Sequence, residues 1–182
     1  MRDLAQACGV RMNTIQHHFG SKPHLYEEIL RRWDEEIESL VARVLAGEQS
    51  EEGLVAQVVG ELFDLYLARR DRVAISARAV LGEGLPARNS ALDPSWVGFM
   101  SSEMRARKIG TPGLDLRLLF ITIEGILNNH ALSMSHYQRL FGRDVTDREL
   151  AAKTKAHLRR VILAILGSVP GAREADSAGK ES

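Results

Sequence analysis

The sequence has a single cysteine, Cys8, and it lacks a long uninterrupted apolar run. One cysteine cannot form an intramolecular disulfide, which is typical of proteins in the reducing cytosol. The opening MRDLAQACGV has no apolar core of the kind found in signal peptides, and charged and amide side chains interrupt the most apolar stretch, residues 114–132. We therefore expect a cytoplasmic protein without a membrane-spanning segment.

An excess of charge is also missing, since 24 basic residues balance 24 acidic ones. The net charge of the chain therefore gives no argument for binding to nucleic acid. Locally, residues 1–32 carry five basic and three acidic side chains together with three histidines, which is a modest basic excess. The chain has no glycine-rich phosphate loop, no nucleophile elbow and no metal-ligand spacing, so an enzyme is disfavoured and no cofactor or metal is expected.

Alternating strand patterns are absent, and apolar residues recur at helical spacing along the chain. We predict an all-α protein. After a first helix that Gly9 ends, helices are expected over about 12–19, 22–46, 51–70, 71–83, 95–108, 114–137 and 146–166. Thr146 and Glu149 form a capping-box pattern for the last of these helices. Residues 84–94 are predicted to form a loop, and residues 169–182 a disordered tail.

Residues 1–30 (MRDLAQACGVRMNTIQHHFGSKPHLYEEIL) predict two short helices, a turn and a longer third helix. Gly9 suits the left-handed turn between the first two, and Val10 is expected to fill that turn. Ile15 and Phe19, four residues apart, predict the buried side of the second helix. Ser21 is a suitable cap for the third. Segment 13–22 then offers small polar, imidazole and ammonium groups, which is how a helix is presented to the DNA major groove.

The order RDLAxxxGV, a short turn and NTIQHHFGSK closely resembles the TetR family of one-component bacterial transcriptional regulators. In that family a segment such as I-A-x-x-A-G-V-S-x-x-T-L-Y-x-H-F-x-S-K-x-x-L holds the turn and the recognition helix. The resemblance covers about residues 2–30; farther along, only the number and order of helices are similar. The positions in register are Leu4, Ala5, Ala7, Gly9, Val10, Thr14, His18, Phe19, Ser21, Lys22 and Leu25.

The resemblance implies an incomplete helix-turn-helix DNA-binding region with a long connecting helix at 1–46. A helical effector-binding and dimerisation domain would follow at 47–168, before the tail. Thr14, His18 and Lys22 match positions that meet the DNA backbone. Gln16 stands where the family often has Tyr, so it keeps a phosphate donor but loses the aromatic contact.

Four further residues of the opening segment would then point toward base edges: Arg11, Met12, Asn13 and His17. Donor and acceptor geometry fits Arg11 to guanine and Asn13 to adenine. Arg11 also replaces the usual Ser at the start of the recognition helix. That change either weakens the start of the helix by about 1 kcal/mol or adds a charge at the groove.

Family members begin with one more amphipathic helix, whereas Met1 here directly precedes RDLA. We expect the apolar faces of Leu4, Val10, Ile15 and Phe19 to be partly uncovered. Either an internal Met was assigned as the start, which we favour, or the chain is truncated. For the chain as written we expect weak or absent operator binding.

The segment 114–137 is apolar on nearly every side, which predicts a helix buried in a core or in a subunit interface. Its Glu124 and Asn128 either bond to neighbouring helices or across an interface, or line an effector cavity. Residues of the preceding helix either form adaptable apolar walls for that cavity or only fill the core: Trp96, Phe99, Met100 and Met104.

The resemblance implies a homodimeric regulator, most often a repressor, which binds a palindromic operator in double-stranded DNA and leaves it when an unknown small-molecule effector binds. Helices 114–137 and 146–167 would form a four-helix interface, and helix 22–46 would act as a lever. The alternative is a truncated helical ligand-binding and dimerisation protein without autonomous DNA binding. The spacing of His17, His18 and His24 disfavours a metal cluster, and Cys8 is expected to be a small buried residue.

Overall fold

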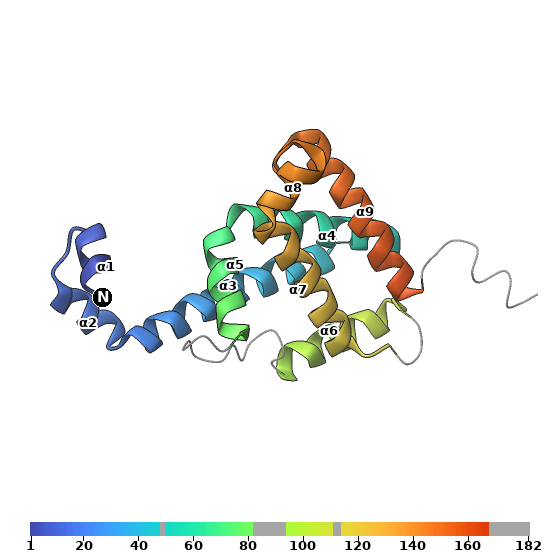
Figure 1. Cartoon of the computed structure of the whole chain (residues 1–182). Coiled ribbons are helices and arrows are strands. Elements are labelled where there is room, and N and C mark those ends of the chain that lie inside the picture. The colour runs from blue at the N-terminus through green and yellow to red at the C-terminus, as the bar shows by residue number, and fades with distance from the viewer. Residues whose placement is uncertain (48–49, 82–93, 111–113, 168–182) are drawn as a thin grey trace, which may run out of the picture.

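The computed structural model describes residues 1–47, 50–81, 94–110 and 114–167 (Figure 1). All regular secondary structure within these ranges is helical, which confirms the all-α prediction. The predicted tail and residues 84–93 of the predicted loop lie outside the described residues, and Pro94 begins a helix. In chain order the helices are α1 Arg2–Ala7, α2 Met12–Phe19, α3 Lys22–Leu45, α4 Glu51–Ala68, α5 Arg70–Val80, α6 Pro94–Ala106, α7 Leu116–Leu132, α8 Met134–Phe141 and α9 Arg148–Leu166.

Helices α1 and α2 pack against each other across a short turn. Gly9 has a φ of +66°, in the left-handed region that favours glycine. The Val10 N–H donates to the Ala5 carbonyl at 3.0 Å, which closes the turn. Ala5 and Ile15 are the buried residues of the two helices. The predicted turn and the bounds of the second helix are therefore confirmed.

Helix α3 joins the α1–α2 pair to the rest of the molecule (Figure 1). It begins after Ser21, whose Oγ accepts a hydrogen bond from the His24 N–H at 3.3 Å, and Pro23 lies in its first turn. Its 24 residues span about 36 Å at the usual helical rise. One side of its second half is buried in the body of the protein, through Trp33, Asp34, Leu40, Val41, Val44 and Leu45.

Helix α4 lies at the centre of that body, with α3, α5, α7 and α9 packed against it. The Trp33 and Tyr66 rings meet edge-on with centroids 5.0 Å apart, which joins α3 to α4. Phe63 and Val73 are almost fully buried in the same core. In the described part of the chain, no helix combines the length and apolarity that crossing a bilayer requires.

The single helix predicted over 114–137 is wrong. It is broken at Ser133, which ends α7 and starts α8 with φ −92° and ψ 40°. Ser is a weaker helix former than the residues around it, and its hydroxyl donates to the side chain of Asn129 at 3.1 Å. Leu118 and Ile121 of this segment are 63% and 51% exposed in the single chain, so the chain's own core does not cover every side of α7.

The capping box predicted at the last helix is also wrong, because Asp147 is the cap. Its carboxylate accepts a hydrogen bond from the Leu150 N–H at 3.1 Å. The Thr146 hydroxyl instead donates to Asp144 at 2.9 Å, and Glu149 bonds to Lys153. Because Asp is as good a cap as Thr, the helix begins one residue later once Asp144 has engaged Thr146.

Candidate nucleic-acid interface and ligand cavity

The eight residues predicted to meet DNA lie together at one tip of the molecule, on and around α2 (Figure 1). Arg11 directly precedes α2, Lys22 begins α3, and the other six belong to α2. Every one of them is exposed: Arg11, Met12, Asn13, Thr14, Gln16, His17, His18 and Lys22. The structure therefore places the whole predicted set on or beside one exposed helix.

Most of these side chains have no polar partner within the described residues. The side chains of Arg11, Asn13 and Gln16 form neither a hydrogen bond nor an ion pair there, and the Arg11 side chain does not cap α2. The Lys22 ammonium lies 5.7 Å from the centre of the Tyr26 ring. Donors that are exposed and uncommitted can bind phosphate or base edges without first breaking an internal bond.

The hydrophobic support beneath this surface is small. Leu4 and Phe19 are only half-buried, and Val10 is 40% exposed, so it does not fill the turn as predicted. Ile15, by contrast, is buried, although we expected it to be partly uncovered. Cys8 is exposed rather than buried, because the chain turns at Gly9 and no described element covers the thiol.

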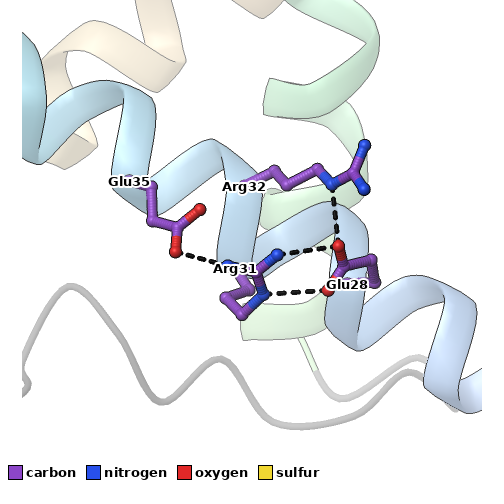
Figure 2. A network of polar contacts seen from close by, with 4 residues as sticks. All are labelled: Glu28, Arg31, Arg32 and Glu35. Atoms are coloured by element: carbon purple, nitrogen blue, oxygen red, sulfur yellow. Dashed lines mark hydrogen bonds and ion pairs between the residues drawn. The ribbon is translucent and has the colours of Figure 1, made fainter.

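A network of four charged side chains follows on the exposed part of α3 (Figure 2). The Glu28 carboxylate accepts two hydrogen bonds from Arg31, at 2.7 and 2.8 Å, and one from Arg32 at 2.7 Å. Arg31 also pairs with Glu35. The hydrogen bonds from Arg31 and Arg32 lower the pKa of Glu28 to about 2. This network pairs the cations along α3, whereas Arg11 and Lys22 have no carboxylate partner among the described residues.

A partly open cavity of about 140 Å³ lies in the body between α3, α4, α6, α7 and α9. Four of the six residues predicted for a ligand pocket line it: Trp96, Met100, Met104 and Glu124. Trp96, Met100 and Met104 recur every four residues along one face of α6. The Trp96 ring contacts Phe120 of α7, with centroids 4.6 Å apart.

The other two predicted pocket residues do not line the cavity. Phe99 lies about 100° around α6 from Met100, and it is 41% exposed. Asn128 is half-buried, one turn beyond Glu124 along α7 and past the last lining residue of that helix, Leu127. Their place in an apolar segment therefore did not show whether these two residues face the cavity.

Sequence reasoning missed the wall that α3 supplies to this cavity. Asp34, Ile37 and Glu38 line it together with residues nearer the end of the helix. Asp34 is only 5% exposed, although carboxylates are rarely buried. The available signal was an acidic residue directly after Trp33, inside the apolar stripe of the helix.

A second hollow, of about 620 Å³, lies between α7, α8 and α9 and is lined mainly by polar residues. Within it, His130 Nδ1 bonds to the Tyr137 hydroxyl across the break at Ser133. Burial and the nearby His157 lower the pKa of His130, and burial raises the pKa of Tyr137. Among the described residues, no group of three or more potential ligands is arranged to hold a metal ion.

No known protein family, curated protein or solved structure matches this chain. A functional proposal therefore depends on three features of this chain. These are the opening motif, the eight exposed residues on and around α2, and the cavity beside α3.

Proposed function

We propose that this protein is a TetR-like transcriptional regulator that binds a palindromic operator as a homodimer. Its most informative feature is α3. This helix begins beside the exposed residues of α2, and its second half lines the cavity. One rigid element thus connects a candidate DNA surface to a candidate effector site. We infer a repressor that leaves its operator when a small molecule occupies the cavity.

In this proposal α2 is the recognition helix. Ile15 anchors it, while Asn13 and His17, four residues apart on the opposite face, point toward base edges. Lys22, at the start of α3, reaches a phosphate oxygen, where the helix N-terminus adds a favourable dipole. Arg11 contributes a cation without an internal partner at the entry to the groove.

The dimer is proposed to form through the outer faces of α7 and α9. Both helices pack on α4, and Ile126 of α7 and Leu158 of α9 line the same small apolar gap. Leu118, Ile121 and Ile165 on the two helices are exposed apolar side chains, and groups of such residues mark interaction surfaces. A two-fold axis there would present two α2 helices to a palindromic site.

Operator selection from a random DNA library, followed by fluorescence anisotropy at several salt concentrations, tests the regulator. Because the core under α2 is small, we expect a palindromic sequence that binds weakly to emerge. The logarithm of its association constant should fall linearly with the logarithm of salt concentration. Asn13→Ala/His17→Ala should lose affinity, while His136→Ala, an exposed change on α8, should retain it. Failure to select any sequence would refute DNA recognition by this chain.

A second candidate is a helical ligand-binding and dimerisation protein without autonomous DNA binding. The observation that favours it is the small core under α2, where Ala5 and Ile15 are the only buried residues of α1 and α2. Amide hydrogen exchange separates the two candidates. If the α2 amides are protected from exchange as strongly as the α4 amides, the regulator is supported. Fast exchange throughout α1 and α2, together with no DNA binding, supports the alternative.

A further inference from the structure

We propose that the polar hollow between α7, α8 and α9 binds a small molecule that combines a carboxylate or phosphate group with an apolar ring. This hollow and the cavity beside α3 share no lining residue. The exposed apolar residues of the proposed dimer face, Leu118, Ile121 and Ile165, do not line the hollow either. This second site therefore lies beyond the proposed function, and its ligand can be tested without DNA.

Glu149 supplies the only carboxylate among the described residues that line the hollow. Its Oε1 accepts a hydrogen bond from Lys153 Nζ at 2.8 Å, and its Oε2 accepts one from Arg143 Nη1 at 3.0 Å. The hydrogen bonds from Lys153 and Arg143 lower the pKa of Glu149. Because this carboxylate is ionised and each of its oxygens already has a cationic partner, it offers little to a cationic ligand.

The polar groups that remain for a ligand are mainly hydrogen-bond donors. Arg143 contacts Glu149 and Asp147 through Nη1, whereas a guanidinium has five N–H donors. Lys153 has three donors on its ammonium, of which one bonds to Glu149. The Asn129 Oδ1 accepts a hydroxyl at 3.1 Å, which leaves the amide N–H groups of that side chain. Such a set favours a ligand with negatively charged acceptor oxygens.

Imidazoles from all three helices also line the hollow. His136 of α8 and His157 of α9 form neither a hydrogen bond nor an ion pair within the described residues, whereas His130 of α7 bonds to the Tyr137 hydroxyl. Burial and then the nearby His157 lower the pKa of His130, so these two rings lie close enough for their charges to repel. An anion bound beside them would reduce that repulsion, whereas a cation would add to it.

The end of α8 gives the hollow an apolar side. Leu140 and Phe141 line it although they are 72% and 56% exposed, and the Phe141 ring lies 5.8 Å from the Tyr137 ring between centroids. Apolar and aromatic side chains beside a few polar groups are typical of small-molecule sites. We therefore assign an apolar ring to the part of the ligand that meets α8. The hollow is partly open, so it sets no upper limit on ligand size.

Isothermal titration calorimetry on the full chain without DNA tests the ligand class with five probes: phenylacetate, phenyl phosphate, benzyl alcohol, benzylamine and acetate. We expect at least one aromatic anion to bind at millimolar concentration, and the comparison of the two shows whether carboxylate or phosphate is preferred. Benzyl alcohol and benzylamine lack the negative charge and acetate lacks the ring, so each should bind at least about tenfold more weakly. Equal or tighter binding of any of these three, or no binding of any probe, would overturn the proposal.

Variants then locate the anion. Arg143→Met keeps much of the side-chain stem but removes the donors, so it should weaken the tighter aromatic anion about tenfold. Arg148→Met is the matched control, because Arg148 is an exposed arginine of α9 that does not line the hollow. His157→Ala removes an exposed side chain without an internal bond, so it tests the site even if Arg143→Met does not fold, and it should also weaken the anion. Unchanged affinity in the folded variants, or an equal loss in Arg148→Met, would refute the site.

Discussion

At the scale of single residues, α2 separates side chains that hold the helix from side chains available to a partner. Ile15 is buried against the rest of the tip, while Asn13, His17 and their neighbours are exposed. An exposed imidazole or amide adds little to folding, so replacing it should change binding without changing stability. Lys22 offers the most quantitative test, because a phosphate contact has a defined dependence on salt.

We predict that Lys22→Gln weakens binding to all DNA sequences by a similar factor. Each lost phosphate contact should reduce the magnitude of the slope of log K against log salt by about 0.9 per protomer. Lys153→Gln is the control, since Lys153 pairs with Glu149 on α9, far from α2. Anisotropy titrations over a salt series measure both variants. An unchanged slope for Lys22→Gln would show that this ammonium does not contact phosphate.

His130 predicts a pH dependence of stability. Burial lowers its pKa in the folded state, so the unfolded chain binds a proton more readily. Stability should therefore fall as the pH drops below about 6.5, the ordinary histidine value. His130→Gln should reduce the change of the unfolding midpoint between pH 7.5 and 5.5. His136→Gln, at an exposed residue of the same hollow, should not reduce it. Equal slopes in wild type and His130→Gln would contradict this assignment.

At the scale of helices, the glycine and capping residues predicted those helix ends that depend on local interactions. Gly9 and Ser21 predicted the end of α1 and the start of α3, because a positive φ or a capping hydroxyl acts within one turn. The break at Ser133 was not predictable, because the apolar pattern continues through it and the bend becomes apparent only when Tyr137 meets His130. The contribution of α3 to the cavity wall was not predictable either. It depends on which helices pack against Asp34, and the sequence around Asp34 does not show this.

Helix α3 should hold α2 in position for DNA only while it remains stiff. We predict that Arg31→Gly/Arg32→Gly, which costs about 1 kcal/mol of helix propensity per position, weakens operator binding. Arg31→Ala/Arg32→Ala removes the same ion pairs (Figure 2) but keeps a good helix former, so it should retain more of the operator affinity. Fluorescence anisotropy measures the operator Kd of both variants. The same Kd for both would exclude α3 stiffness as the cause.

At the scale of the whole molecule, the proposal requires two copies whose α2 helices face the same side of the DNA. The outer faces of α7 and α9 expose apolar side chains, while α4 buries their inner faces. The family resemblance implied an interface of helices 114–137 and 146–167, but nothing in the sequence predicted that the first of them ends at Leu132. Helix α8 therefore lies outside the helix pair proposed to pair across the two-fold axis.

We predict that Ile121→Glu converts the proposed dimer to a monomer. In a two-fold interface each substitution occurs twice, so a carboxylate enters the apolar contact from both sides without a partner. Val80→Glu on α5 is the control, because Val80 is 67% exposed and Ile121 is 51% exposed, yet Val80 lies outside the proposed interface. Sedimentation velocity should show a dimer for wild type and for Val80→Glu, and a folded monomer for Ile121→Glu. The monomer should bind a full palindrome no more tightly than a half-site, because the second α2 is no longer held in place. A stable Ile121→Glu dimer would place the interface elsewhere.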